Sequence, residues 1–233
     1  MKQLRVKKPY RLVKPFLIFI IIGVSSIYFL TSQKRKLPVY NPYDVNPRLV
    51  DIDVQHVKKG HKIADFTLIN QNGETITQKD YKNKIYVADF FFTRCTTICP
   101  IMSKHMGVLQ KEFAQIEDVS FLSMSVTPVM DSVPVLKKYA KSKGAINKKW
   151  NLTTGDKKHI YELARKSFMA VLDEGDGGAQ DFIHTEQFVL IDEKKQIRGF
   201  YDGTSIKDVK RLIDDIYLLR DIKNKLKINT LSD

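Results

Sequence analysis

The stretch from Ile85 to Pro100 reads IYVADFFFTRCTTICP and decides the fold prediction. Its first half is almost continuously apolar, which is typical of a central strand covered on both faces. A short loop follows with Cys95 and Cys99, the two cysteines of the chain, and then Pro100, a residue favoured in the first turn of a helix. A buried strand that leads through a cysteine loop into a helix is an architecture that presents reactive thiols.

Strands and helices alternate through the rest of the domain, and an antiparallel pair of strands is expected near its end. The expected strands are 66–69, 74–77, 85–92, 119–126, 187–192 and 197–201, with a short edge segment at 150–152, and the expected helices are 100–113, 132–143, 156–167 and 206–225. This order predicts an α/β fold of the thioredoxin type, in which helices flank a central mixed sheet.

The charge of the chain is concentrated near its beginning. The formal net charge of the whole chain is +13. Residues 1–43 hold nine Lys or Arg and no acidic residue, whereas the remainder holds 30 basic and 26 acidic residues. A basic groove along the folded domain is therefore poorly supported, and no nucleic-acid partner is expected.

An uncharged run from Phe16 to Gln33, which begins FLIFIIIGVSSIYFL, predicts a transmembrane anchor, with a cleaved signal peptide as the alternative. Six basic residues precede the run and three follow it, so the N-terminus should lie in the cytoplasm. The expected location is the bacterial inner membrane, with the folded domain on the periplasmic side. The predicted layout is a basic segment at 1–15, an anchor at 16–33, a proline-containing linker at 34–55, the domain at 56–226 and a tail at 227–233.

The spacing of Cys95 and Cys99 suits a shared metal ion better than a disulfide. Residues four apart on a helix have Cβ atoms about 5–6 Å apart, whereas a disulfide needs about 3.5–4.5 Å. A disulfide remains an accessible second state if Cys95 bends out of helical geometry. The helix N-terminus should make both thiols easier to ionise, and soft thiolates select Cu(I), with zinc as a competitor.

A copper ion held by two thiolates needs a further ligand, for which imidazole is suitable. His184 is the best candidate because it directly precedes the expected strand 187–192, and the loop before that strand should lie beside the cysteine loop. The other histidines are placed near the linker, on an exposed helix or facing away from the cysteines: His56, His61, His159 and His105. The methionines Met102, Met106, Met124 and Met130 are expected to pack in the core.

Together these residues resemble the Sco (SenC) family of copper-delivery proteins over most of residues 60–220. The resemblance rests on the hairpin with Gly73, FFFTRCTTICP at 90–100, Ser125–Pro128 with Asp131 and Pro134, Trp150 with Leu152–Gly155, His184 before FVLID, and Gly203 in YDGT. A C-x3-C-P motif after an apolar strand, joined to a late histidine before another strand, is a specific combination.

The resemblance implies a membrane-tethered domain that binds one copper ion, as Cu(I) or Cu(II), through Cys95, Cys99 and His184. It further implies a role in assembling the copper centre of cytochrome c oxidase, by delivering copper, by reducing the ligand cysteines, or by both. The partner would be the copper-site subunit of the oxidase or another copper chaperone, and the protein would not be an enzyme in the turnover sense. Two departures from the family pattern, the absence of an acid between the cysteines and Thr127-Pro128 in place of Asp-Pro, remove carboxylates that tune site charge.

Two alternatives use the cysteines without a metal. In the first, Cys95 and Cys99 are the catalytic pair of an extracytoplasmic thiol–disulfide oxidoreductase, and His184 is dispensable. In the second, a single cysteine of low pKa beside Arg94 reduces peroxide.

Overall fold

The computed structural model describes residues 20, 22, 23, 25, 36–171, 183 and 185–229, and it divides the chain into a unit at 1–36 and a compact unit from Leu37 onward. Ile20, Ile22, Gly23 and Ser25 are helical, but the predicted anchor at 16–33 otherwise falls outside the described residues. Among the residues that were described, no helix combines the length and the apolar character that a membrane crossing requires.

A seven-stranded mixed sheet forms the centre of the compact unit, in the order β2-β1-β5-β4-β3-β6-β7. The three inner strands β3, β4 and β5 are parallel, and an antiparallel hairpin is added on each side. The strands are β1 Thr67–Asn70, β2 Thr75–Thr77, β3 Ile85–Phe91, β4 Val119–Ser125, β5 Trp150–Thr154, β6 Gln187–Ile191 and β7 Ile197–Asp202.

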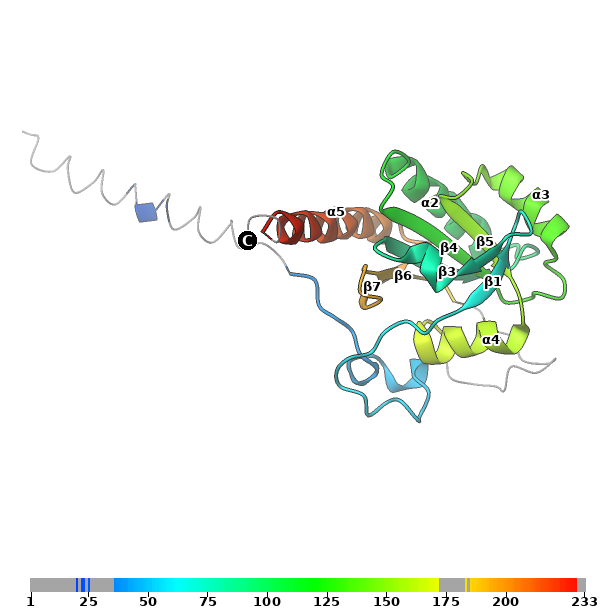
Figure 1. Cartoon of the computed structure of the whole chain (residues 1–233), viewed down its shortest axis with the longest axis horizontal. Helices are drawn as coiled ribbons and strands as arrows, with labels where there is room; N and C mark the ends of the chain where they lie inside the picture. Colours follow the sequence, from blue (N-terminus) through cyan, green and yellow to red (C-terminus); the bar gives the residue numbers. More distant parts are fainter. Residues whose placement is uncertain are drawn as a thin grey trace, which may run out of the picture. The chain divides into compact units, whose positions relative to one another are not determined.

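Helices cover both faces of this sheet (Figure 1). One apolar cluster joins the sheet to α2, α3 and α5, and a second joins the opposite face to α4. The helices are α2 Ile98–Glu112, α3 Val133–Lys143, α4 Lys157–Glu162, which continues as a π-helical turn at Leu163–Ser167, and α5 Ile206–Asn229. The expected α/β architecture, a central mixed sheet flanked by helices, is confirmed.

The strand β5 differs from its prediction. Trp150–Thr154 was expected to include an edge segment, but it lies between β1 and β4 and all five residues are buried. Its polar side chains are satisfied inside the protein, since Asn151 donates to the Tyr81 hydroxyl at 3.0 Å and Thr153 donates to the Ser123 carbonyl at 3.0 Å. The prediction of interior strands relied on runs of apolar residues. The polar residues of β5 interrupt such a run, so its interior position was not predicted.

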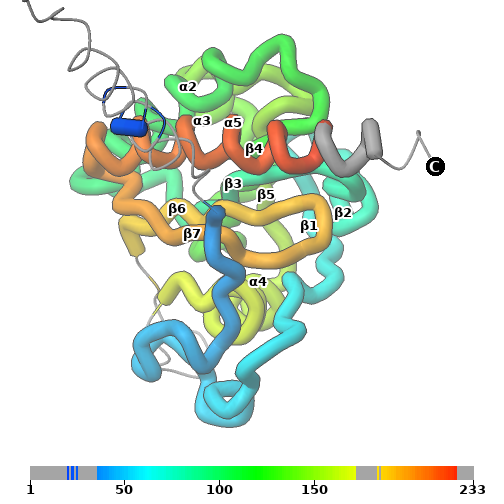
Figure 2. Tube along the Cα trace, turned by 90° about the vertical axis from the view of Figure 1, so that its left-hand side faces the viewer, coloured from blue at the N-terminus to red at the C-terminus, as the bar shows by residue number. Residues whose placement is uncertain are grey.

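The segment expected to be a linker packs against the domain from Leu37 onward. Tyr40 forms a β-bridge with Ile197, and the Arg198 guanidinium donates to the Leu37 carbonyl at 2.7 Å. Val50 is fully buried in the core cluster on the α4 face. Figure 2 shows this blue segment running beside β7 before it turns below the sheet. Pro42 and Pro47 in this segment begin two 3₁₀ turns, Pro42–Asp44 and Pro47–Leu49.

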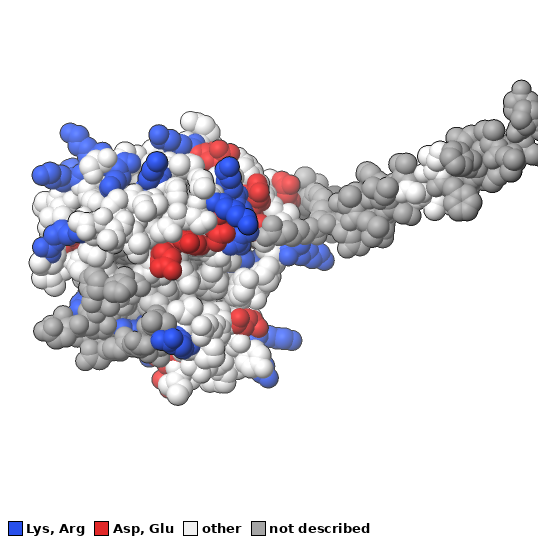
Figure 3. Space-filling view, turned by 180° about the vertical axis from the view of Figure 1, so that it is seen from behind, with Lys and Arg blue, Asp and Glu red and all other residues white. Residues whose placement is uncertain are grey.

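Charged side chains of both signs lie on the surface that Figure 3 shows. On the face seen in Figure 3, Lys and Arg side chains are scattered with a group of Asp and Glu side chains among them.

Candidate functional site

The cysteine loop connects the end of β3 to the start of α2. Cys99 lies in the first turn of α2 and is buried, whereas Cys95 lies ahead of the helix and is half-buried. The Cys99 backbone N–H donates to the Cys95 sulfur at 3.4 Å, so this sulfur accepts from the N-terminus of the helix. Both thiols are free, and the expected placement of the pair is confirmed.

The two thiols differ in acidity. Burial raises the pKa of Cys95, but hydrogen bonds from Cys99 and Thr97 outweigh it and lower the pKa to about 7. Burial raises the pKa of Cys99 to about 12, although a hydrogen bond from the Phe92 backbone opposes this rise. The expectation that the helix N-terminus would make both thiols easier to ionise is therefore wrong for Cys99, because its sulfur is taken out of water.

A buried carboxylate lies on the same face of the sheet as α2. Asp89 on β3 is 3% exposed and accepts a hydrogen bond from Ser123, whose hydroxyl in turn accepts from the Trp150 indole at 2.8 Å. Burial raises the pKa of Asp89 to about 7, and its charge contributes to the raised pKa of Cys99. Sequence reasoning missed Asp89, although a single acid within the apolar run IYVADFFF was a signal for it.

Hydrogen bonds connect the loop after β4 to the cysteine loop. Asp131 is fully buried and accepts from both the backbone N–H and the hydroxyl of Thr93, two residues before Cys95. Sequence reasoning named Asp131 as part of a motif and gave it no role.

The predicted third ligand, His184, lies outside the described residues. The strand β6, which His184 precedes in sequence, runs antiparallel to β3, with Ala88 opposite Val189. The start of β6 therefore lies at the end of β3 from which the cysteine loop departs. Thr185 is buried at this entry, where its hydroxyl accepts from the Gln187 backbone at 3.1 Å. The structure therefore places the entry to β6 at the end of the sheet from which the cysteine loop departs.

The described histidines have other surroundings. His105 is buried, with Nδ1 hydrogen-bonded to the Gly203 carbonyl at 2.7 Å, and His61 Nε2 is hydrogen-bonded to the Ser167 carbonyl at 2.8 Å. His159 lies on α4, on the opposite face of the sheet from α2. Within the described ranges, no three His, Cys, Asp or Glu side chains gather as a metal site would require.

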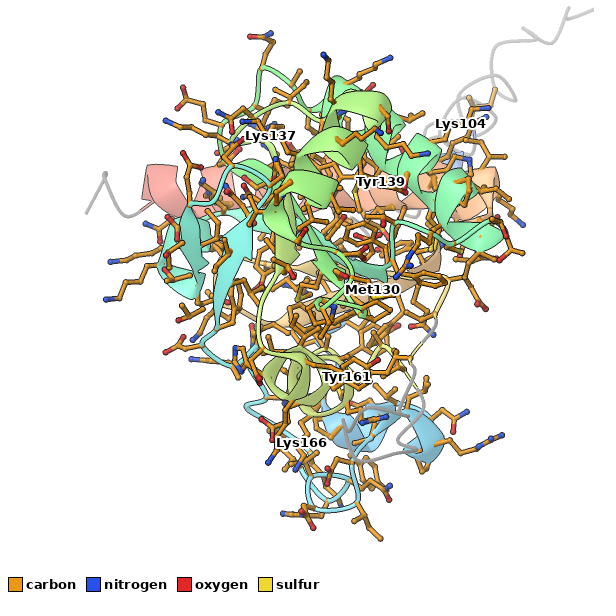
Figure 4. All side chains as sticks on the ribbon, turned by 90° about the vertical axis from the view of Figure 1, so that its right-hand side faces the viewer. Lys104, Met130, Lys137, Tyr139, Tyr161 and Lys166 are labelled. Atoms are coloured by element: carbon orange, nitrogen blue, oxygen red, sulfur yellow. The ribbon has the colours of Figure 1, made fainter. Side chains whose placement is uncertain are left out.

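Of the four methionines expected in the core, Met102, Met106 and Met124 are fully buried there, as expected. Met130 was also expected to pack in the core, but it is 51% exposed and its neighbour Val129 is 86% exposed. In Figure 4, Met130 lies between Tyr139 of α3 and Tyr161 of α4 on the face turned to the viewer. Met130 lies in a tight turn in which its own N–H and that of the buried Asp131 both donate to the Thr127 carbonyl at 2.9 Å.

A family model, SCO1/SenC, matches residues 54–219, which is well over half of the chain. The chain belongs to the SCO1/SenC family. The match covers the sheet, the cysteine loop and the entry to β6, and it leaves out Leu37 and Val50 of the core.

Solved Sco structures share this fold. A SCO1/SenC family lipoprotein from Bacillus anthracis is 33% identical, with a TM-score of 0.61 over 69% of this chain and 95% of that one. BsSco, described as a cytochrome c oxidase assembly protein with a disulfide switch, is 32% identical, with a TM-score of 0.58 over 68% and 93%. Arabidopsis thaliana ScoI, solved with copper bound, is 24% identical, with a TM-score of 0.53 over 68% and 98%, a likeness that shows the fold alone.

Proposed function

We propose that this Sco protein binds one copper ion through Cys95, Cys99 and His184 and uses it in assembling the copper centre of cytochrome c oxidase. The domain would be of the thioredoxin type, held at the outer face of the bacterial inner membrane by the segment 16–33. BsSco, a relative with 32% identity, is described as a member of a family of oxidase assembly proteins, which supports this role.

The observation that carries the proposal is the state of the cysteine pair. Two free sulfurs lie at the N-terminus of α2, with Cys99 N–H donating to Cys95 Sγ at 3.4 Å. A pKa of about 7 leaves the Cys95 thiol largely ionised just above neutral pH, whereas Cys99 must lose its proton to bind. Two sulfurs form a donor set that suits a soft ion such as Cu(I). Copper is carried by the protein and is not a permanent cofactor. The two sulfurs bind it and later release it to the copper-site subunit of the oxidase or to another copper chaperone.

Copper titration of the domain 37–233 tests the proposal. The wild type should bind one equivalent, and the variants Cys95→Ser, Cys99→Ser and His184→Ala should each lose tight binding. His56→Ala is the matched control, since His56 is exposed and lies far from the cysteines in sequence. If copper stoichiometry and affinity are the same in His184→Ala as in His56→Ala, the ligand assignment is wrong.

The difference between the two thiols favours a second candidate function, thiol–disulfide exchange. An accessible thiolate at Cys95 next to a protonated Cys99 is the division of roles that such exchange uses. This reading predicts that the reduced domain transfers electrons to a protein disulfide at a rate that His184→Ala does not change. A copper-free domain that fails to reduce such a disulfide would exclude it.

A further inference from the structure

Asp131 accepts hydrogen bonds from two parts of the chain, Thr93 after β3 and the segment Ser125–Thr127 at the end of β4. Its Oδ1 accepts from the Thr93 hydroxyl at 2.6 Å. Its Oδ2 accepts from the Thr93 backbone N–H at 3.2 Å, the Ser125 hydroxyl at 2.6 Å and the Thr127 hydroxyl at 3.0 Å. Asp131 is fully buried, and all four of these donors are uncharged.

A carboxylate is the acceptor that this arrangement requires. Each hydroxyl has a single proton to donate, so the hydroxyls of Thr93, Ser125 and Thr127 are all oriented toward Asp131. Bonds to an ionised acceptor are about twice as strong as neutral ones. A carboxylate in place of the Thr127 hydroxyl would repel Asp131 instead of donating to it.

The hydrogen bonds from Thr93 connect this cluster to the cysteine loop. They join residues 38 apart in sequence, across the ends of the neighbouring strands β3 and β4. Hydrogen bonds within the loop are longer, such as the bond from Cys95 N–H to the Phe92 carbonyl at 3.3 Å. Thr93, two residues before Cys95, is therefore held in place by Asp131, which lies outside the cysteine loop.

We propose that Asp131 is a positioning residue that holds the cysteine loop in the geometry in which Cys95 and Cys99 bind one metal ion. The inference rests on the proposed function. It assigns the hydrogen-bonded cluster around Asp131 a role in metal affinity, beyond its contribution to the stability of the fold.

The test compares Asp131→Asn with Asp192→Asn in the domain 37–233. Asp192 is a matched control because it is 2% exposed and accepts from Lys194 N–H, Gln196 N–H and the Arg198 guanidinium at 2.8–2.9 Å. It follows β6, at the end of the sheet opposite the cysteine loop. Both variants should lose thermal stability, but Asp131→Asn alone should weaken Cu(I) binding, by about 10- to 100-fold in competition with a chelator.

A second variant covers the case in which Asp131→Asn does not fold. Thr93→Val keeps the shape of the side chain and the backbone hydrogen bond but removes the 2.6 Å hydrogen bond. It should weaken Cu(I) binding by about 5- to 10-fold, as expected for one net hydrogen bond. It should also shift the midpoint potential of the Cys95–Cys99 dithiol, a property that loss of stability alone does not change.

The outcomes separate the two proposals. If the wild type binds copper and both Asp131→Asn and Thr93→Val bind it with unchanged affinity and potential, the positioning role is overturned and the proposed function stands. If Asp192→Asn weakens copper binding as much as Asp131→Asn does, the effect is general destabilisation and the positioning role is again overturned. A wild type that binds no copper overturns both.

Discussion

Cys95 and Cys99 differ in how readily they react, because the pKa of Cys95 is about 7 and that of Cys99 is about 12. Since the thiolate is the nucleophile, the alkylation rate of Cys95 in the reduced protein should rise with pH through a midpoint near 7. Cys99 should be modified at least about 100-fold more slowly at pH 7. Mass spectrometry of iodoacetamide-treated protein over pH 5–10 measures both rates, and a midpoint near 9 for Cys95 would contradict the assignment.

Asp89 links the stability of the core to pH. Burial raises its pKa to about 7, above the value near 3.9 of an unfolded chain. Because the folded value is the higher one, the stability that Asp89 contributes is complete below about pH 4 and is lost as the pH rises to about 7. The uncharged variant Asp89→Asn should therefore gain up to about 4 kcal/mol in free energy of unfolding at pH 8 relative to wild type, with a much smaller change at pH 4.

Urea unfolding at the two pH values measures this difference. Asp192→Asn serves as the contrast because it removes an ion pair with Arg198 and should lower stability at pH 8. An Asp89→Asn variant whose effect is the same at pH 4 and pH 8 would show that the carboxylate is not responsible.

At the scale of elements, the segment from Leu37 to Gln55 belongs to the folded domain. Val50 in this segment is 0% exposed, whereas Ile52, two residues later, is 77% exposed. Val50→Ala should lower the free energy of unfolding by about 2 kcal/mol through lost burial and the cavity left behind. Ile52→Ala should change it by less than about 0.5 kcal/mol.

Truncation extends the same test to the whole segment. A chain of residues 56–233 should be less stable to urea than one of residues 37–233, because it lacks Val50, Tyr40 and the carbonyl groups that Arg198 binds. Equal unfolding midpoints for the two chains would show that the segment is a linker, as the sequence alone suggested.

The elements that sequence reasoning predicted are those with a strong local pattern. The almost continuously apolar run of β3 and the largely apolar, partly alternating run of β4 identified central strands, and the cysteine loop before Pro100 identified the start of a helix. The failures involve contacts distant in sequence. The interior position of β5 depends on hydrogen bonds of Asn151 with Tyr81 and of Thr153 with Ser123. The packing of the segment that begins at Leu37 depends on hydrogen bonds from Arg198. A local pattern carries no information about such partners.

The same division holds within the candidate site. The cysteine pair was predicted because its spacing and neighbours are local. The hydrogen bonding of Asp131 was not predicted, because its bond to Thr93 spans 38 residues. The different acidity of the two thiols was not predicted either, because it depends on how deeply each sulfur is buried.

In the molecule as a whole, the sheet brings distant segments of the chain to one end. The parallel strands β3 and β4 deliver the cysteine loop and the Asp131 loop to the same edge, and the antiparallel β6 begins there. His184, predicted from this topology, is proposed to complete a copper site with the two sulfurs.

X-ray absorption of the copper-loaded domain 37–233 tests that claim most directly, because it counts the atoms bound to copper. We expect two sulfur ligands and one imidazole per copper ion, with the imidazole signal lost in His184→Ala and retained in His56→Ala. A wild-type spectrum without imidazole, or one that His184→Ala leaves unchanged, would contradict that claim.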